Sequence, residues 1–154
     1  MRFRIVGLPS EPFAHLFALS QEELAARGAV RVTAEVGNGY PCRISLTDAA
    51  PGQDVILTHY EHHAVDSPFR SSYAIYVREG ETTFDAVDRV PEQLRSRLLS
   101  VRAFDGRGML LDGDVVAGGE LEGAIGKMFT DERAAYLHVH YAKPGCYAAR
   151  VERG

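Results

Sequence analysis

The chain has 154 residues, the usual size of one domain, and seventeen basic against twenty-one acidic residues give it a formal net charge of −4. Hydrophobic residues make up 45% and charged residues 25% of the sequence, which is the balance of a folded protein rather than a disordered one. The basic residues are scattered, so the continuous positive surface that nucleic acid requires is missing. We therefore expect one globular domain over residues 1–154 and no nucleic-acid partner.

The first residues contain no apolar run long enough for a signal peptide, and no stretch of the sequence is long and apolar enough to span a bilayer. Cys42 and Cys146 are the only cysteines, and they lack the CxxC spacing of redox or zinc motifs. These features predict a cytoplasmic protein with two free thiols and no membrane partner.

The first forty residues predict a strand, two helices and a second strand. Residues 2–6 alternate in polarity as a strand does, and apolar residues at helical spacing predict a short helix over 13–17. Ser20 and Glu23 have the spacing of a capping box, which predicts a helix that ends at Gly28. Residues 30–36 alternate again, so they predict a strand with one dry face, followed by a turn at 37–39.

The middle of the chain predicts mostly strands. They are expected over residues 42–46, 54–60 and 73–78. Pro91 is suited to the first position of a helix that carries Leu94, after which residues 98–104 predict a strand.

The last third of the chain predicts one helix and a hairpin. Leu121, Ile125, Met128 and Phe129 form an apolar stripe at helical spacing, which predicts a helix despite two internal glycines. Residues 136–141 and 147–152 predict two strands joined by a tight turn at 143–145. Strands and helices do not alternate as in a parallel fold, so the expected class is α+β. We expect a mostly antiparallel sheet with a few short helices packed on one side or end.

Five of the six histidines lie in two short stretches, at residues 59–63 and 138–140. Side chains alternate along a strand, so His138 and His140 share a face and could supply two ligands to a divalent metal such as zinc. His62, from another strand, is the candidate third ligand. The simpler alternative is that the neighbouring apolar residues form the core while both histidines face solvent or cross-strand partners.

His62 and His140 are also candidates for catalytic proton transfer, because imidazole exchanges protons near neutral pH. Cys42 is a candidate nucleophile if a histidine lies beside it, although a cysteine packed as a small apolar group explains it more simply.

Arginines recur in or near the predicted strands, and a guanidinium group can hold a carboxylate or phosphate. Arg43 and Arg70 are the candidates to bind a small acidic molecule. Structural salt bridges are the simpler explanation, since many acidic residues are available as partners.

Several runs resemble a bacterial family catalogued as a domain of unknown function, family 1203. They are Phe-Arg-Ile-Val-Gly-Leu-Pro at 3–9, Gly-Tyr-Pro-Cys-Arg-Ile-Ser-Leu at 39–46, Tyr-Glu-His at 60–62, Ser-Pro-Phe-Arg at 67–70 and His-Tyr-Ala-Lys-Pro-Gly-Cys-Tyr-Ala-Ala-Arg at 140–150. The resemblance implies a stand-alone domain but no activity, cofactor or catalytic residue. It directs attention to the residues inside these runs, namely Cys42, Arg43, His62, Arg70, His140, Cys146 and Arg150.

Two functional hypotheses follow. In the first, the domain binds a small acidic molecule and acts as an enzyme or a binding protein, with a polar pocket lined by histidines and arginines that holds a metal or the ligand. In the second, it is a non-catalytic interaction module that forms a homodimer or binds another protein, and its histidines are structural. Convergence of histidines and arginines in one place would favour the first hypothesis.

Overall fold

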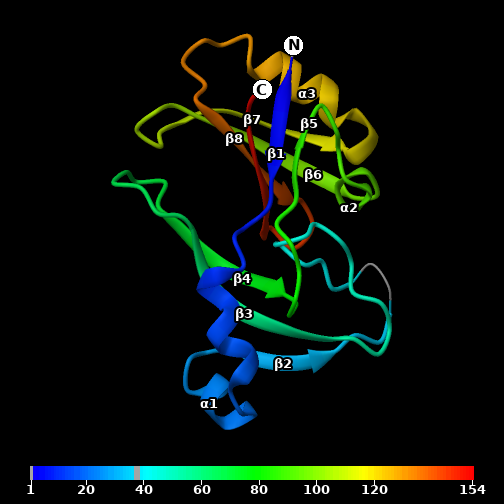
Figure 1. Ribbon diagram of the computed structural model, residues 1–154. Helices are drawn as coiled ribbons and strands as arrows, with labels where there is room; N and C mark the ends of the chain where they lie inside the picture. Colours follow the sequence, from blue (N-terminus) through cyan, green and yellow to red (C-terminus); the bar gives the residue numbers. More distant parts are fainter. Residues whose placement is uncertain (1, 37–38) are drawn as a thin grey trace.

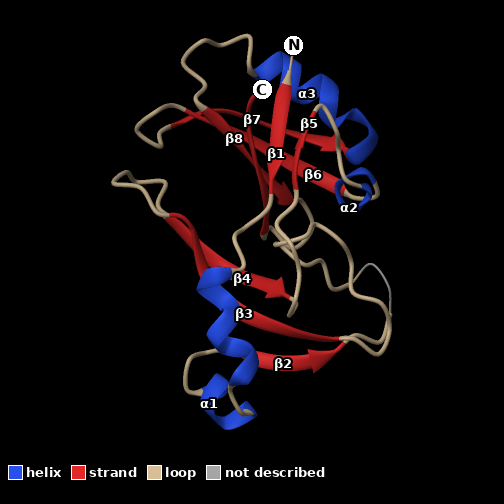
Figure 2. Cartoon of the chain, viewed as in Figure 1, coloured by secondary structure: helices blue, strands red, loops and turns tan. Residues whose placement is uncertain are grey.

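The computed structural model describes residues 2–36 and 39–154, which form two antiparallel sheets (Figures 1 and 2). The large sheet has the strand order β5-β1-β9-β8-β6-β7, and the small sheet has the order β2-β3-β4. The strands of the large sheet are β1 (Phe3–Val6), β5 (Asp85–Val87), β6 (Leu98–Phe104), β7 (Leu110–Ala117), β8 (Tyr136–Tyr141) and β9 (Tyr147–Arg153). Those of the small sheet are β2 (Val30–Thr33), β3 (Asp54–His63) and β4 (Ser71–Val77).

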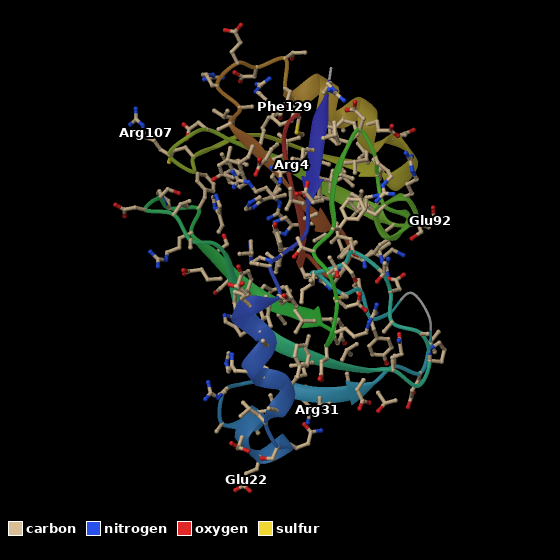
Figure 3. All side chains as sticks on the ribbon, viewed as in Figure 1. Arg4, Glu22, Arg31, Glu92, Arg107 and Phe129 are labelled. Carbon is tan, nitrogen blue, oxygen red and sulfur yellow. The ribbon has the colours of Figure 1, made fainter. Side chains whose placement is uncertain are left out.

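The helices are short, and they lie beside both sheets. They are the 3-10 helices η1 (Glu11–Ala18) and η2 (Gly118–Glu120) and the α-helices α1 (Gln21–Ala25), α2 (Glu92–Arg95) and α3 (Leu121–Met128). Figure 3 shows Glu92 and Phe129 beside the large sheet, and Glu22 and Arg31 at the opposite end of the molecule beside the small sheet. No helix in the described part of the chain is long and apolar enough to cross a membrane.

The large sheet has one apolar face and one polar face. Val101 and Val139 are paired on neighbouring strands and belong to the main core, where Leu121 and Ile125 of α3 pack with them. The residues that alternate with Val101 along β6 and with Val139 along β8 point to the other side of the sheet, because successive side chains of a strand lie on opposite faces. This second face carries polar and aromatic side chains, and the small sheet approaches it. We call it the polar face.

Contacts between the two layers are polar and aromatic: Tyr147 packs in one cluster with apolar residues of the small sheet, and the His63 ring lies 4.2 Å from that of Phe104. The hydroxyl of Ser67, in the β3–β4 connection, donates to the carbonyl of Gly108 in the β6–β7 turn at 3.0 Å. The guanidinium of Arg43 donates to the carbonyl of Tyr147 on β9 at 2.7 Å. His63 of β3 bonds to Tyr136 of β8. The residues that hold the two layers together are therefore also those with the chemistry of a site.

Much of the predicted secondary structure is confirmed. The predicted strands at 98–104 and 136–141 coincide with β6 and β8, and α3 contains Leu121, Ile125 and Met128 of the predicted apolar stripe, with Phe129 as its C-cap. The capping box of Ser20 and Glu23 is present at the start of α1, and Gly28 has the positive φ of 71° that lets the chain turn away. All strand pairs of both sheets are antiparallel, as expected.

Three expectations fail. Residues 42–46 form no strand: Leu46 N–H donates to Cys42 O within a turn in which Leu46 itself has a φ of 54°. The strand at 30–36 ends at Thr33, and its dry face is confirmed in part: Val32 packs against the small core that contains Ala34, whereas Val30 is 41% exposed. Strands β5 and β7 were not predicted, and part of the expected turn at 37–39 lies outside the described residues.

Gly7 lets the chain after β1 lie directly on the segment that carries Arg43. A Cβ atom at Gly7 would stand 2.2 Å from the carbonyl oxygen of Ile44. Around this contact, Gly7 N–H donates to Phe84 O and Leu8 N–H donates to Arg43 O, both at 2.8 Å. The backbone of Arg43 can take this position because residue 7 is a glycine and has no side chain.

Gly7→Ala is expected to lower the free energy of unfolding by about 1–3 kcal/mol, the usual cost of overpacking a buried site. Gly126→Ala is the control, because nothing lies within 4 Å of a Cβ added there and alanine favours the helix by up to about 1 kcal/mol. Chemical denaturation of both variants measures the difference. If the Gly7→Ala variant is as stable as the wild-type protein, the chain relaxes freely at Gly7.

Candidate functional site

The polar face of the large sheet brings two histidines, two arginines and a tyrosine together. His138 on β8 is paired in register with Arg102 on β6 and with Arg150 on β9. His140, two residues further along β8, is paired with Tyr147 on β9. The strand order, which the sequence does not reveal, is what makes these residues neighbours.

The end of β3 adds two more histidines. The register of β3 against β4 shifts between Tyr60 and His63, and such a bulge lets consecutive side chains reach the same region. The ring of His62 lies 5.1 Å from that of His140, and the ring of His63 lies 4.9 Å from that of His138, measured between centroids. We call these four residues, His62, His63, His138 and His140, the histidine cluster.

Hydrogen bonds fix the tautomers of two rings. His63 Nδ1 lies 2.8 Å from the carbonyl of Phe69, so it donates, and Nε2 accepts from the Tyr136 hydroxyl at 2.6 Å. His140 Nδ1 donates to Gly145 O at 3.0 Å, and its Nε2 faces a guanidinium nitrogen of Arg102 at 3.5 Å.

Burial keeps His62, His138 and His140 uncharged. It is the main cause that lowers the pKa of His138 to about 2, of His140 to about 3 and of His62 to about 4, and neighbouring histidines and Arg102 add to the effect. The Nδ1 atoms of His62 and His138 are buried without a hydrogen-bond partner among the described residues. At neutral pH these three imidazoles are therefore neutral, and two of them have a ring nitrogen without a hydrogen bond to a described residue.

The three predicted metal ligands, His62, His138 and His140, do come together, but without a coordination geometry. In the part of the chain that the structure describes, no group of three histidine, cysteine, aspartate or glutamate side chains is placed to hold a metal ion. The rings of His138 and His140 are 6.4 Å apart, and the Arg102 guanidinium faces His140 Nε2. Zinc as a cofactor stays a prediction.

Two other candidates lie away from the cluster. Cys42 is fully buried in the apolar core beside Ile44 and Ile75, where it packs as a small apolar group. The side chain of Arg70 is 60% exposed and pairs with Glu61 at 2.9 Å.

Arg43, in contrast, is buried to 1% exposure and has no carboxylate partner in the described residues. Its guanidinium donates to Tyr147 O at 2.7 Å, to Pro41 O at 2.6 Å and to the sulfur of Cys146 at 2.9 Å. All three acceptors are uncharged or weakly polar groups. The positive charge is therefore solvated by the protein but not neutralised.

Arg43 lies at the wall of a cavity of about 530 Å³, which we call the arginine pocket. The pocket is lined by Gly39, Pro41, Arg43, Tyr76, Ser96, Arg97, Leu98, Tyr141, Lys143, Pro144 and Cys146. The Tyr141 ring contacts the guanidinium groups of Arg43 and Arg97, each 5.1 Å from the centroid. Arg97 is paired with Asp48 at 3.0 Å, whereas Lys143 is exposed and has no ion pair with a described residue.

No carboxylate belongs to the lining of the arginine pocket. Two positive charges, Arg43 and Lys143, are left without an acidic partner in the described part of the chain, so the pocket has a positive potential. Burial also raises the pKa of Tyr141 and of Tyr76, which keeps both hydroxyl groups neutral. The arrangement suits an anionic ligand with an apolar or aromatic body.

Sequence reasoning identified Arg43 but not its surroundings. Lys143 appears in the sequence only as a turn residue, and Tyr141 only as an apolar partner on the core side of β8. Tyr147, whose ring stacks on that of His62 at 5.2 Å, was likewise not singled out. The single available signal was the run at 140–150, which contains all three of these residues.

Residues 39–153 match a family model described as a protein of unknown function (DUF1203). The match includes Arg43, the arginine pocket and the histidine cluster, while the similar run at 3–9 lies outside it. No curated protein and no solved structure matches the chain.

Stability should fall as pH falls below about 6.5, the ordinary histidine pKa. There the unfolded chain protonates His138 and His140 while the folded protein, with both pKa values lowered, does not. The unfolded state then binds more protons, and each histidine removes about 1.4 kcal/mol per pH unit until its folded pKa is approached. Urea denaturation at pH 7.5, 6 and 5 measures this slope.

His140→Asn should flatten that slope, because it removes one titrating group while the amide can still donate to Gly145 O. His15→Gln, on the exposed surface of η1, is the matched control and should keep the wild-type slope. An unchanged slope in the His140 variant would mean that His140 is not held neutral by burial.

Proposed function

This chain belongs to the DUF1203 family, which carries no assigned activity, and we propose from the geometry that it binds a small anionic molecule in the arginine pocket. The single observation that supports the proposal is the buried Arg43 guanidinium without a carboxylate partner. Taking an uncompensated charge out of water costs several kcal/mol, and an anionic ligand would offset that cost.

The pocket also indicates a class of ligand. Its volume of about 530 Å³ lies within the range of roughly 300–1,000 Å³ that is usual for small-molecule sites. Arg43 and Lys143 suit a carboxylate or phosphate group, and the rings of Tyr76 and Tyr141 suit an apolar or aromatic body. A small organic acid or phosphate ester is the proposed ligand, and a cytoplasmic location, with both thiols free, fits such a role.

The competing hypothesis, a non-catalytic interaction or homodimerising module, has less support. The histidines gather with Arg102 on the polar face, and Arg43 and Arg97 line the adjacent pocket, so these residues cluster in two neighbouring places instead of being dispersed. Exposed large apolar side chains in the described residues are spread over β2, β4, β5, β6, β7 and two loops; they are Val30, Val36, Tyr73, Val87, Leu98, Met109, Leu110 and Val115. Convergence of the polar residues supports the small-molecule hypothesis.

The test is a thermal-shift screen with small mono- and dicarboxylates and phosphate esters, followed by calorimetry of the hits. A ligand at a hundred times its Kd should stabilise the wild-type protein by about 2.7 kcal/mol. Lys143→Gln should weaken binding without loss of stability, because Lys143 is exposed. Arg43→Met should abolish binding, since it removes the buried charge.

Arg70→Gln is the matched control, because Arg70 lies on the surface in its own ion pair with Glu61. It should bind every hit with wild-type affinity. A hit whose Kd is the same in wild type, Lys143→Gln and Arg43→Met does not occupy the arginine pocket. If all hits behave in this way, the proposed function is wrong.

A further inference from the structure

We propose that Arg102 and the histidine cluster form a second site, which binds a small oxyanion independently of the arginine pocket. Arg102 is half-buried on the polar face, and its recorded partners are neutral: the Ser100 hydroxyl at 3.2 Å and His140 Nε2 at 3.5 Å. No carboxylate among the described residues pairs with it. It is therefore a positive charge that the folded chain leaves uncompensated.

The unused nitrogens of the cluster provide the second, independent observation. His138 is 2% exposed, and its Nδ1 atom has no hydrogen-bond partner in the described residues; the same holds for Nδ1 of His62. Native proteins rarely leave buried polar atoms unpaired. An oxyanion beside Arg102 would accept hydrogen bonds from these ring nitrogens and neutralise the guanidinium at the same time.

The charges around the cluster favour an anion over a metal cation. Arg102 faces His140 directly and has no ion pair with a described residue, whereas Arg150, which is in register with His138, is paired with Glu152. The nearby carboxylates already have partners: Glu61 pairs with Arg70, and Glu152 pairs with Arg150 and Arg4. A metal cation there would meet the positive charge of Arg102, and Asp114 is the one carboxylate in the lining of the depression beside it.

Access to Arg102 is open from the β7 edge of the sheet. A depression of about 440 Å³ there is lined by Ser100, Arg102, Leu110, Gly113, Asp114 and Val115. Gly113 is the register partner of Arg102 and has no side chain to cover it. The acid in this lining, Asp114, accepts a hydrogen bond from the backbone of Val115.

The second site is separated from the arginine pocket by the backbone of Cys146 and Tyr147. On one side, Arg43 donates to the carbonyl of Tyr147 and to the sulfur of Cys146. On the other side, the Tyr147 ring stacks on His62 with an interplanar angle of 16°. Occupancy of the two sites can therefore be measured separately.

The test is a titration with inorganic phosphate, monitored by long-range ¹H–¹⁵N spectra of the histidine rings. The ring-nitrogen signals of His62 and His138 should shift saturably in the wild-type protein. Arg102→Gln should weaken the phosphate Kd at least tenfold, and Arg102→Lys should restore part of the affinity because it keeps the charge. Arg70→Gln is the control with an unchanged Kd.

Lys143→Gln separates this proposal from the proposed function, because Lys143 is exposed and lines the arginine pocket. Phosphate should still shift the cluster signals in that variant, and in wild-type protein saturated with an arginine-pocket ligand. Absence of any saturable shift in folded wild-type protein would overturn the second site, as would an Arg102→Gln variant with wild-type affinity. Stoichiometric zinc binding at the same rings, without a phosphate effect, would overturn it in favour of a metal site.

Discussion

The buried guanidinium of Arg43 is the interaction on which the arrangement of the two sheets depends. Its side chain bonds to Tyr147 and Cys146 at the start of β9, in the large sheet, and its backbone N–H donates to Tyr76 O on β4, in the small sheet. Its own carbonyl accepts from Leu8, just after β1. One residue thus joins three distant parts of the chain, and its charge is balanced by dipoles alone.

Residues 42–46 were predicted as a strand, and the connecting role of Arg43 explains why they do not form one. The segment has the apolar content of a strand, but its backbone groups bond to Leu8, Tyr76 and Phe84, which belong to different parts of the fold. A segment that connects several elements cannot form a regular ladder with one of them. Its partners are distant in sequence, so local pattern could not reveal this.

The sequence was sufficient to predict features that depend on local residue spacing. It was insufficient to predict features that depend on strand order. The capping box at Ser20, the strand at 136–141 and the His138–His140 pair on one face all follow from spacing. The approach of His62 and His63 to that pair required the β3 bulge and the packing of the small sheet on the polar face. Lys143 and Tyr141 join the arginine pocket through tertiary contacts that no motif encodes.

Burial has opposite consequences for the charge of side chains on the polar face and in the arginine pocket. At His62 and His138, burial removes the charge and leaves a ring nitrogen of each without a hydrogen-bond partner among the described residues. At Arg43, the charge persists because a guanidinium group cannot be deprotonated in a protein, and the chain surrounds it with acceptors. The neutral histidines and the charged Arg43 therefore lie on the two sides of one peptide, between Cys146 and Tyr147.

The turn between β8 and β9 belongs to both regions. Lys143 and Pro144 line the arginine pocket, while the carbonyl of Gly145, a residue with a φ of 84°, fixes the tautomer of His140. Surface turns usually tolerate insertions, because little depends on their length. Here one extra residue between Tyr141 and Cys146 would displace Lys143 and the carbonyl that accepts from His140 together, so the length of this turn constrains both regions at once.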